Sequence, residues 1–437
     1  MALRRDFLRT LIATSVQMVV VLGTQVILAR ALGIEDRGSY AVCWSFMNVL
    51  LMLSLFGVSP SITYHLASSR LSVSQIVGVS LYIGVGGSLF AAAVGYAAIH
   101  LPVEFFLKAT KTEFVFAIAS VSPYLFFTCA IAVLRGTMRY VAMNCMNLLE
   151  SVIVAIGTLL LCVVFKCGIK GALVAGMLGP TIVVLWTLIL FRKEISINEA
   201  IKSFRHVPSV LHYGIRAYLS YFAWSLNIQL SIFIMGFFLF KSEIGFFAIA
   251  LAMVVRMEII PGALYEVLMP RLVQNKDQSA DLLCRALRVV MIAVFAAAIV
   301  LALICRPLVR LAFGEEYLPV VGIVYILLLG TVLRSASKVV TTYFFAVDRP
   351  GTNSLIKFLG LCFNIVILLI LIPTYGLKGG AVGTTLSYSL EAIVMVAVFY
   401  WISKVDSWKM LLPGVSDFLA FKNLALSMVG KDCISKH

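Results

Sequence analysis

Long apolar runs follow one another along the whole chain and are separated by short polar segments. Each run is long enough to cross about 30 Å of hydrocarbon as a helix. None has the alternation of apolar and polar residues that a membrane β-strand requires, and only helices and closed barrels satisfy the backbone in lipid. We therefore predict an all-α polytopic membrane protein with about twelve spans. They lie near residues 10–29, 41–62, 76–99, 114–134, 143–165, 171–191, 217–240, 244–269, 287–305, 320–345, 354–373 and 379–402.

The polar segments between the runs carry most of the positive charge. Placing the N-terminus in the cytoplasm puts about 21 Lys and Arg residues in cytoplasmic segments and about 10 outside, as the positive-inside rule expects. We therefore predict a multi-pass protein of the cytoplasmic (inner) membrane with both termini in the cytoplasm. The net charge of +15 then reflects this bias and contact with anionic membrane lipids rather than binding to nucleic acid.

Composition narrows the possible functions further. Hydrophobic residues make up 62% of the 437 residues and charged residues only 13%, where a soluble domain carries about 25% charged residues. No polar segment between the runs is long enough for a catalytic domain. The nine cysteines include no C-x-x-C pair and no His at metal-ligand spacing. We predict a protein that is not an enzyme and that needs no cofactor and no metal.

An internal repeat divides the chain into two similar halves. The segment "CGIKGALVAGMLG" resembles "YGLKGGAVGTTLS", which pairs Lys170 with Lys378, and Gly38 pairs with Gly245 at nearly the same offset. Each half holds an even number of spans, so both halves enter the membrane in the same direction, which is a known plan of transporters. The expected organisation is an N-terminal six-helix lobe at 1–191, a cytoplasmic linker at 192–212, a C-terminal six-helix lobe at 213–402 and a cytoplasmic interfacial tail at 403–437.

Ionisable residues within the spans are the main functional candidates, because a basic group near mid-bilayer costs on the order of 3 kcal/mol and needs water, a partner or a ligand. Four candidate cations lie in the second half, and they would give a cavity between the lobes a cationic wall that binds an anion such as phosphate. The alternative is that membrane-embedded acids pair with these cations and hold the helices together. The cations are Arg216, Arg256, Arg334 and Lys338, and the acids are Glu150, Glu258, Glu266 and Glu391.

The span at 244–269 has features that suit a helix that moves during transport. Arg256 and Glu258 are two residues apart, so they point to different sides of a helix and are poor partners for each other. Pro261 lies three residues after Glu258 and is expected to kink the helix, because it lacks a backbone N–H. We assign Glu258, Pro261, Glu266 and Glu391 to gating or ion coupling.

A charged stretch, "LARALGIEDRGSYAVCW" at 28–44, interrupts the apolar pattern early in the chain. Its G-x-x-x-x-G spacing lacks the Lys and Ser or Thr of a phosphate-binding loop. The orientation count places the stretch outside the cell. We predict a solvent-facing hinge in which Arg30 and Arg37 balance Glu35 and Asp36.

Several of these segments together resemble the bacterial O-antigen and polysaccharide flippases of the MATE-like (MOP) superfamily. The resemblance implies two six-helix lobes, a cationic central cavity and a polyprenyl-diphosphate-linked oligosaccharide as substrate, with Arg216 as the Arg of the seventh-span motif. Gln229 and Ser231 depart from the family, which often has an Arg and an Asp there. The segments are "LARALGIEDRGSYA", "FGVSPSITYHLA", "YGIRAYLS", "RMEIIPGALYEVLMPRL" and "PLVRLAFGEEYLP".

Two other functions remain as alternatives. A MATE-type drug or cation antiporter needs a carboxylate in the first or seventh span, and neither span has one. A membrane-embedded glycan polymerase or glycosyltransferase would need an acidic motif or a large outer loop, and it would not need the repeat. A flippase that works by alternating access is therefore the favoured function, with the polysaccharide polymerase and chain-length machinery as candidate partners.

Overall fold

The computed structural model describes the chain from residue 2 to residue 403, apart from residues 263, 265–267, 269–271, 273–278 and 348. Within helices it describes the backbone alone at residues 2–13, 67, 216–221, 223–225, 228, 279 and 350. The side chain of Arg216 and all of Glu266 therefore lie outside the described part. The tail predicted as interfacial also lies outside it from residue 404 onward.

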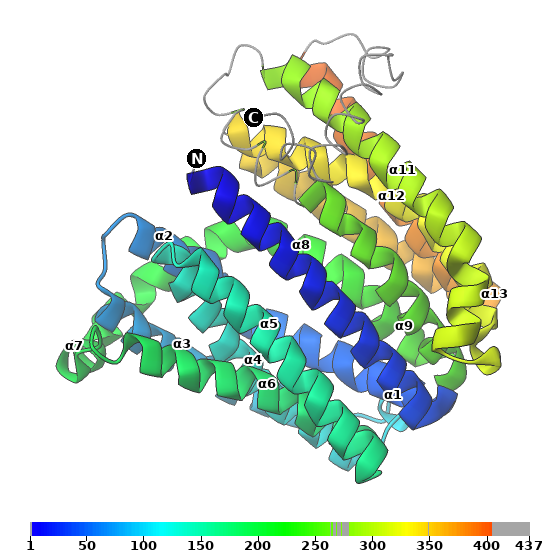
Figure 1. Ribbon diagram of the computed structural model, residues 1–437, viewed down its shortest axis with the longest axis horizontal. Helices are drawn as coiled ribbons and strands as arrows, with labels where there is room; N and C mark the ends of the chain where they lie inside the picture. The colour runs from blue at the N-terminus through cyan, green and yellow to red at the C-terminus, as the bar shows by residue number, and fades with distance from the viewer. Residues whose placement is uncertain are drawn as a thin grey trace, which may run out of the picture.

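The described chain is helical from end to end and contains no strand (Figure 1). The first half holds α1 (Ala2–Leu55), α2 (Val58–Ala67), α3 (Val73–Ala98), η1 (Glu104–Leu107), α4 (Lys111–Gly136), α5 (Tyr140–Thr158), the π-helical turn η2 (Leu159–Val164) and α6 (Gly168–Phe191). The short α7 (Ile197–Lys202) and η3 (Ser203–His206) follow. The second half holds α8 (Val207–Phe238), α9 (Lys241–Val255), η4 (Arg256–Glu258), α11 (Ser279–Ala312), η6 (Glu315–Tyr317), α12 (Pro319–Ala346) and α13 (Pro350–Ser403).

The helices match the predicted membrane spans. Among the described residues, nine helices are long and apolar enough to cross a membrane. Two of them, α1 and α13, have 54 residues each and bend at a glycine with positive φ, Gly33 (74°) and Gly376 (56°). The two predicted spans 354–373 and 379–402 lie within α13, whereas α1 contains the span 10–29 and the span 41–62 only as far as Leu55, the rest of which continues into α2. The 32-residue α8 contains most of the predicted span 217–240 and ends at Phe238. The all-α polytopic membrane fold is confirmed.

Local sequence explains where two of the helices begin. Ser72 and Thr110 precede α3 and α4, and the hydroxyl of each accepts a hydrogen bond from the backbone N–H three residues later. The side chains of Gln75 and Glu113 accept from the backbone N–H of Ser72 and Thr110 in return. These capping boxes satisfy N–H groups that the first helical turn leaves unpaired.

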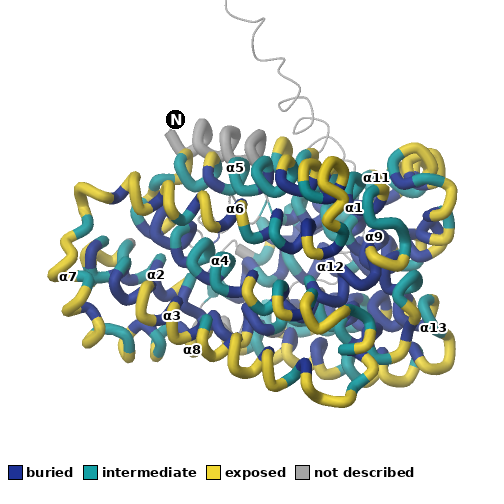
Figure 2. Tube along the Cα trace, turned by 90° about the horizontal axis from the view of Figure 1, so that it is seen from below, coloured by how far each residue is buried: buried dark blue, intermediate teal, exposed yellow. Residues whose placement is uncertain are grey.

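The outer surface is strongly apolar. Figure 2 shows exposed residues along the periphery, while buried residues lie between the helices. Large apolar side chains are among the exposed ones, including Leu89 (67% exposed), Leu303 (75%) and Trp401 (78%). Exposed apolar area on this scale is unfavourable in water and is expected where lipid surrounds the protein.

The equivalent glycines of the internal repeat meet where α1 crosses α9. A Cβ atom added to Gly38 would lie 1.7 Å from the carbonyl oxygen of Lys241. A Cβ added to Gly245 would lie 2.8 Å from the oxygen of Ile34 and 3.5 Å from the Cα of Gly38. Only glycine permits two backbones to approach this closely, which explains why the repeat has glycine at both positions.

This contact yields a prediction with a control on the same helix. We expect Gly38→Ala to push α1 and α9 apart and to destabilise the protein by about 1–3 kcal/mol, the usual cost of overpacking. Gly23→Ala is the control, because nothing lies within 4 Å of a Cβ added there. Thermal unfolding of both variants in detergent measures the difference. Equal stability of Gly38→Ala and Gly23→Ala would contradict the close contact.

The charged stretch near Gly33 differs from its prediction. Glu35 and Asp36 are exposed, but Arg37 is only 3% exposed and donates to Oε1 of Gln25 at 2.6 Å. Arg30 donates to the carbonyl oxygens of Leu311 and Ala312 at the end of α11. The prediction that the two arginines balance the two acids in solvent was wrong, because the chain folds back at Gly33 and turns Arg37 inward.

Candidate functional site

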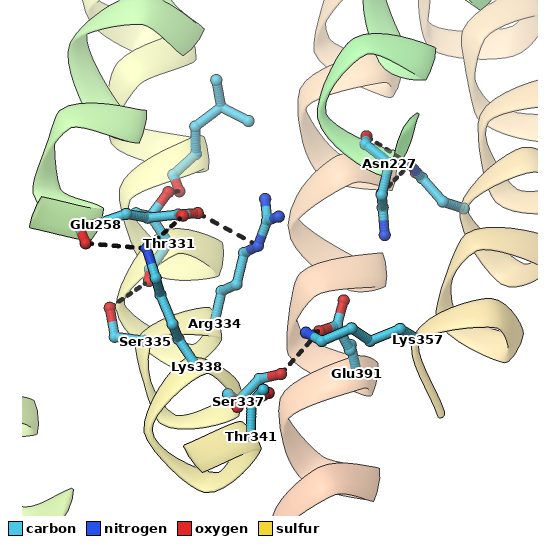
Figure 3. Close-up of polar contacts among 12 residues, drawn as sticks. Asn227, Glu258, Thr331, Arg334, Ser335, Ser337, Lys338, Thr341, Lys357 and Glu391 are labelled. Carbon is cyan, nitrogen blue, oxygen red and sulfur yellow. Dashed lines mark hydrogen bonds and ion pairs between the residues drawn. The ribbon is translucent and has the colours of Figure 1, made fainter. Parts of the chain in front are cut away.

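A cluster of charged side chains joins η4 to α12 inside the second half (Figure 3). One carboxylate, Glu258, contacts two cations. Nε of Arg334 lies 3.3 Å from its Oε1, and Nζ of Lys338 lies 3.5 Å from its Oε2. Nζ of Lys338 also donates to the backbone oxygen of Glu258 at 3.2 Å. We call these three residues the Glu258 cluster.

The two cations of the Glu258 cluster differ in accessibility. They lie one helical turn apart and share a face of α12, as their spacing predicts. The side chain of Arg334 is 3% exposed, and its guanidinium lies over the ring of Tyr388 at 4.1 Å. The side chain of Lys338 is 29% exposed. Lys338 is therefore the member of the cluster that an incoming ligand can reach, while Arg334 is enclosed by protein.

A second ion pair lies beside α12, next to Ser337. Nζ of Lys357 lies 3.0 Å from Oε1 of Glu391, and both residues belong to α13 on either side of its bend. Ser337 of α12 donates to the same carboxylate oxygen at 2.7 Å. The side chains of Lys357 and Glu391 are 7% and 1% exposed. This pair is enclosed by protein. It joins the two arms of α13, which are its segments before and after Gly376, to each other and to α12.

Lys357 is missing from the cations predicted from sequence. Its position inside the predicted span 354–373 was the signal that could have identified it. Its pairing with Glu391 gives that acid a partner that sequence spacing does not reveal, since the two residues lie in different spans.

Polar contacts extend the network toward α8. Nδ2 of Asn364 donates to Oδ1 of Asn227 at 2.6 Å, which joins α13 to α8. Ser231 and Thr384 lie within hydrogen-bond distance at 3.0 Å. Ser231, one of the two departures from the family pattern, is therefore in contact with a neutral hydroxyl group.

Arg256 has a different environment from the other cations. Its Nε atom is buried and has no hydrogen-bond partner among the described residues. It lies at the start of η4, where the α-helical pattern of α9 changes before Pro261, and Pro261 cannot donate a backbone hydrogen bond. A buried N–H group without an acceptor is costly. Arg256, which is partly buried, would therefore gain from an anionic acceptor.

The described charges in this region do not cancel. Four cations (Arg256, Arg334, Lys338 and Lys357) accompany two carboxylates (Glu258 and Glu391), which leaves two excess positive charges. Glu150 does not contribute here, because it contacts Tyr124 and Ser151 in the first half. The pairing of acids with cations therefore holds for Glu258 and Glu391, while binding of an anion by the excess positive charge stays a prediction.

The described residues offer no site for a metal made of His, Cys, Asp or Glu, since no three of these side chains gather in the described ranges. The Arg and Lys side chains of the region are chemically suited to bind anions. Arg binds phosphate oxygens through two parallel N–H groups, and Lys acts as a point charge.

Comparison with known proteins identifies the family. A family model described as polysaccharide biosynthesis protein matches residues 27–322. The chain belongs to this family. The match includes η4 and Glu258, whereas Arg334, Lys338, Lys357 and Glu391 lie beyond its end.

One curated relative of this polysaccharide biosynthesis protein is the probable low-salt glycan biosynthesis flippase Agl15 of Haloferax volcanii. It is 22% identical over 273 residues, which cover 61% of this chain and 56% of that protein. The matched part thus spans little more than half of the relative.

Solved structures with a similar fold include membrane transporters. The lipid II flippase MurJ in an inward closed conformation has a TM-score of 0.75 at 16% identity, over 96% of this chain and 90% of that one. An inward-facing multidrug resistance transporter of the MATE family has a TM-score of 0.63 at 14% identity, over 91% and 100% of the two chains. The polysaccharide biosynthesis protein therefore has the helical membrane fold that these transporters share.

Proposed function

We propose that this polysaccharide biosynthesis protein is a flippase that carries a polyprenyl-diphosphate-linked oligosaccharide across the cytoplasmic membrane by alternating access. The observation that carries the proposal is the excess of positive charge around Arg256 and the Glu258 cluster. A diphosphate crossing the membrane loses its hydration, and charge-assisted hydrogen bonds from Arg and Lys replace it. The family membership and the flippase named among its relatives support the same substrate class.

In this mechanism the diphosphate contacts Arg256 and Lys338, and the polyprenyl tail stays in lipid between helices. The lobes 1–191 and 213–402 rock against each other and expose the headgroup on the outer side. The protein is a transporter without a catalytic step, and both of its termini lie in the cytoplasm. A polymerase of the same glycan is its expected downstream partner.

A MATE-type drug or cation antiporter is the second candidate, because proteins of that family share the fold. The charge of the described site disfavours it. Two excess cations repel a cationic substrate, and the described carboxylates of this site are already paired.

The proposal predicts the effect of Lys338→Met. Losing one charge-assisted contact of about 1.5–3 kcal/mol weakens substrate binding by roughly 10- to 100-fold. We expect lipid-linked glycan to accumulate on the cytoplasmic side of cells that carry only this variant, at normal protein level. Accumulation is measured by extracting the lipid-linked glycan and comparing it with exported polysaccharide.

Lys378→Met is the matched control, because Lys378 is exposed at the bend of α13 and the substitution removes the same charge from the same half. Normal export by Lys338→Met would refute the role of Lys338 in binding. Impaired export by both variants would indicate a general effect of charge on insertion or orientation instead.

A further inference from the structure

Glu150 is an acid of the first half that the proposed mechanism does not use. It lies on α5 and is partly buried. No Lys, Arg or His that the structure describes forms an ion pair with it, unlike Glu258 and Glu391. Its described partners are neutral hydroxyl groups: Tyr124 of α4 at 3.4 Å from Oε1 and Ser151 at 3.1 Å from Oε2. An ionised carboxylate inside a membrane helix is costly without a cation.

The hydrogen bonds around Ser151 show where a proton fits. Its Oγ accepts from Nε2 of Gln17 at 3.0 Å. The same Oγ lies 3.0 Å from the carbonyl oxygen of Asn147 and 3.1 Å from Oε2 of Glu150. A hydroxyl has one hydrogen and two lone pairs, so it can donate to Asn147 or to Glu150 but not fully to both. All three contacts are satisfied together when Glu150 carries a proton and donates it to Ser151.

The groups that face this carboxyl from neighbouring helices are uncharged or aromatic. Tyr124 comes from α4, with Trp44 of α1 edge-on to it at 5.6 Å. Tyr40 of α1 stacks on Trp44 at 5.9 Å, and the guanidinium of Arg37 lies 5.4 Å from the ring of Tyr40. From α6 the neighbour is Gly179, which packs on the backbone of Glu150. The nearest described cation in this series, Arg37, is therefore separated from Glu150 by aromatic rings.

We propose that Glu150 is a reversible proton-binding site that links α5 to α1 through Ser151 and Gln17. With the proton present, Ser151 donates to Asn147 and accepts from both Gln17 and Glu150. When the proton leaves, the Ser151 hydroxyl donates its hydrogen bond to the Glu150 carboxylate instead, and its bond to Asn147 is lost. The nitrogen of Gln17 that donates to Ser151 also contacts the oxygen of Asn147 at 3.3 Å. Loss of the bond between Ser151 and Asn147 therefore changes the contacts that α1 makes with α5 through Gln17. The same helix, α1, contacts the second half through Arg30, which donates to carbonyl oxygens at the end of α11.

Proton binding by Glu150 goes beyond the flippase function and can be tested without any glycan. Infrared spectroscopy of the purified full-length protein in lipid detects the C=O stretch of a protonated carboxylic acid. We expect the wild type to show such a band at acid pH and to lose it at alkaline pH. We expect Glu150→Gln to lack the band. Glu104→Gln is the control, since Glu104 is an exposed carboxylate on η1 and its removal should leave the band unchanged.

Trp44 supplies a second readout, because its ring contacts Tyr124. We expect pH-dependent tryptophan fluorescence in the wild type and a flattened pH response in Glu150→Gln and in Ser151→Ala. The same measurement at fixed pH, with sodium chloride exchanged for choline chloride, tests a sodium ion as the ligand. If the fluorescence responds to sodium but not to pH, the proposal is overturned. An infrared band that is unchanged in Glu150→Gln also overturns it. If both readouts follow the proposal while the protein exports no glycan, the proton site stands and the flippase function falls.

Discussion

Replacing Glu258 by Gln and Arg334 by Met in the same protein is expected to give a folded protein that no longer exports glycan. Arg334→Met alone leaves the buried Glu258 carboxylate with Lys338 as its described partner, and breaking a buried pair in this way costs about 3–5 kcal/mol. The double variant removes the carboxylate as well, so most of that stability should return. Thermal unfolding in detergent and the ratio of retained to exported glycan measure the two effects separately.

The comparison distinguishes two roles for the Glu258 cluster. If the cluster serves only to hold η4 against α12, then the double variant should recover both stability and export. If the cluster positions the cations for an anionic substrate, stability returns and export does not. Recovery of export in the double variant would therefore remove Arg334 and Glu258 from the transport mechanism.

The second large effect is expected at the enclosed pair on α13. Lys357→Met leaves Glu391 buried, with Ser337 as its described donor, at a cost of about 3–5 kcal/mol. Adding Glu391→Gln removes the uncompensated charge, and we expect this double variant to regain both stability and export. The pair is enclosed, so its role is to fix the two arms of α13 and α12 rather than to contact substrate.

Lys338→Met provides the contrast in the same measurement. Its side chain is 29% exposed, against 7% for Lys357, so water compensates part of its charge and its loss should change stability much less. A small stability effect for Lys357→Met, or failed export in the double variant at normal stability, would contradict the structural role of that pair.

The two halves thus differ in charge although their helices repeat. The second half holds the described cations of the candidate site, paired in part with Glu258 and Glu391. The first half holds Glu150 among hydroxyl and aromatic groups. A duplicated fold can in this way carry an anion-binding site in one half and a proton-binding site in the other, with α1 in contact with both halves.

The sequence by itself determined the class of protein, its helical spans and the family, while its division into two repeated halves stays a prediction. These features follow from local properties: a run of apolar residues must form a helix in lipid wherever it lies, because the membrane cannot hydrogen-bond the backbone. The repeat paired Gly38 with Gly245 by their offset alone, and their contact comes from the structure. The charged side chains within the spans were recognised as unusual for the same local reason, since their cost arises from the membrane alone.

Only the tertiary structure decided which charges meet. Glu258 contacts two cations of α12, Lys357 contacts Glu391 of another span, and Arg37 turns inward to Gln25 instead of balancing an acid. Such pairs depend on the rotation and register of helices relative to one another. Apolar runs do not encode that rotation, because residues that face lipid and residues that face another helix are similarly apolar. The spans could therefore be read from the sequence, while the partners of their charges required the packed helices.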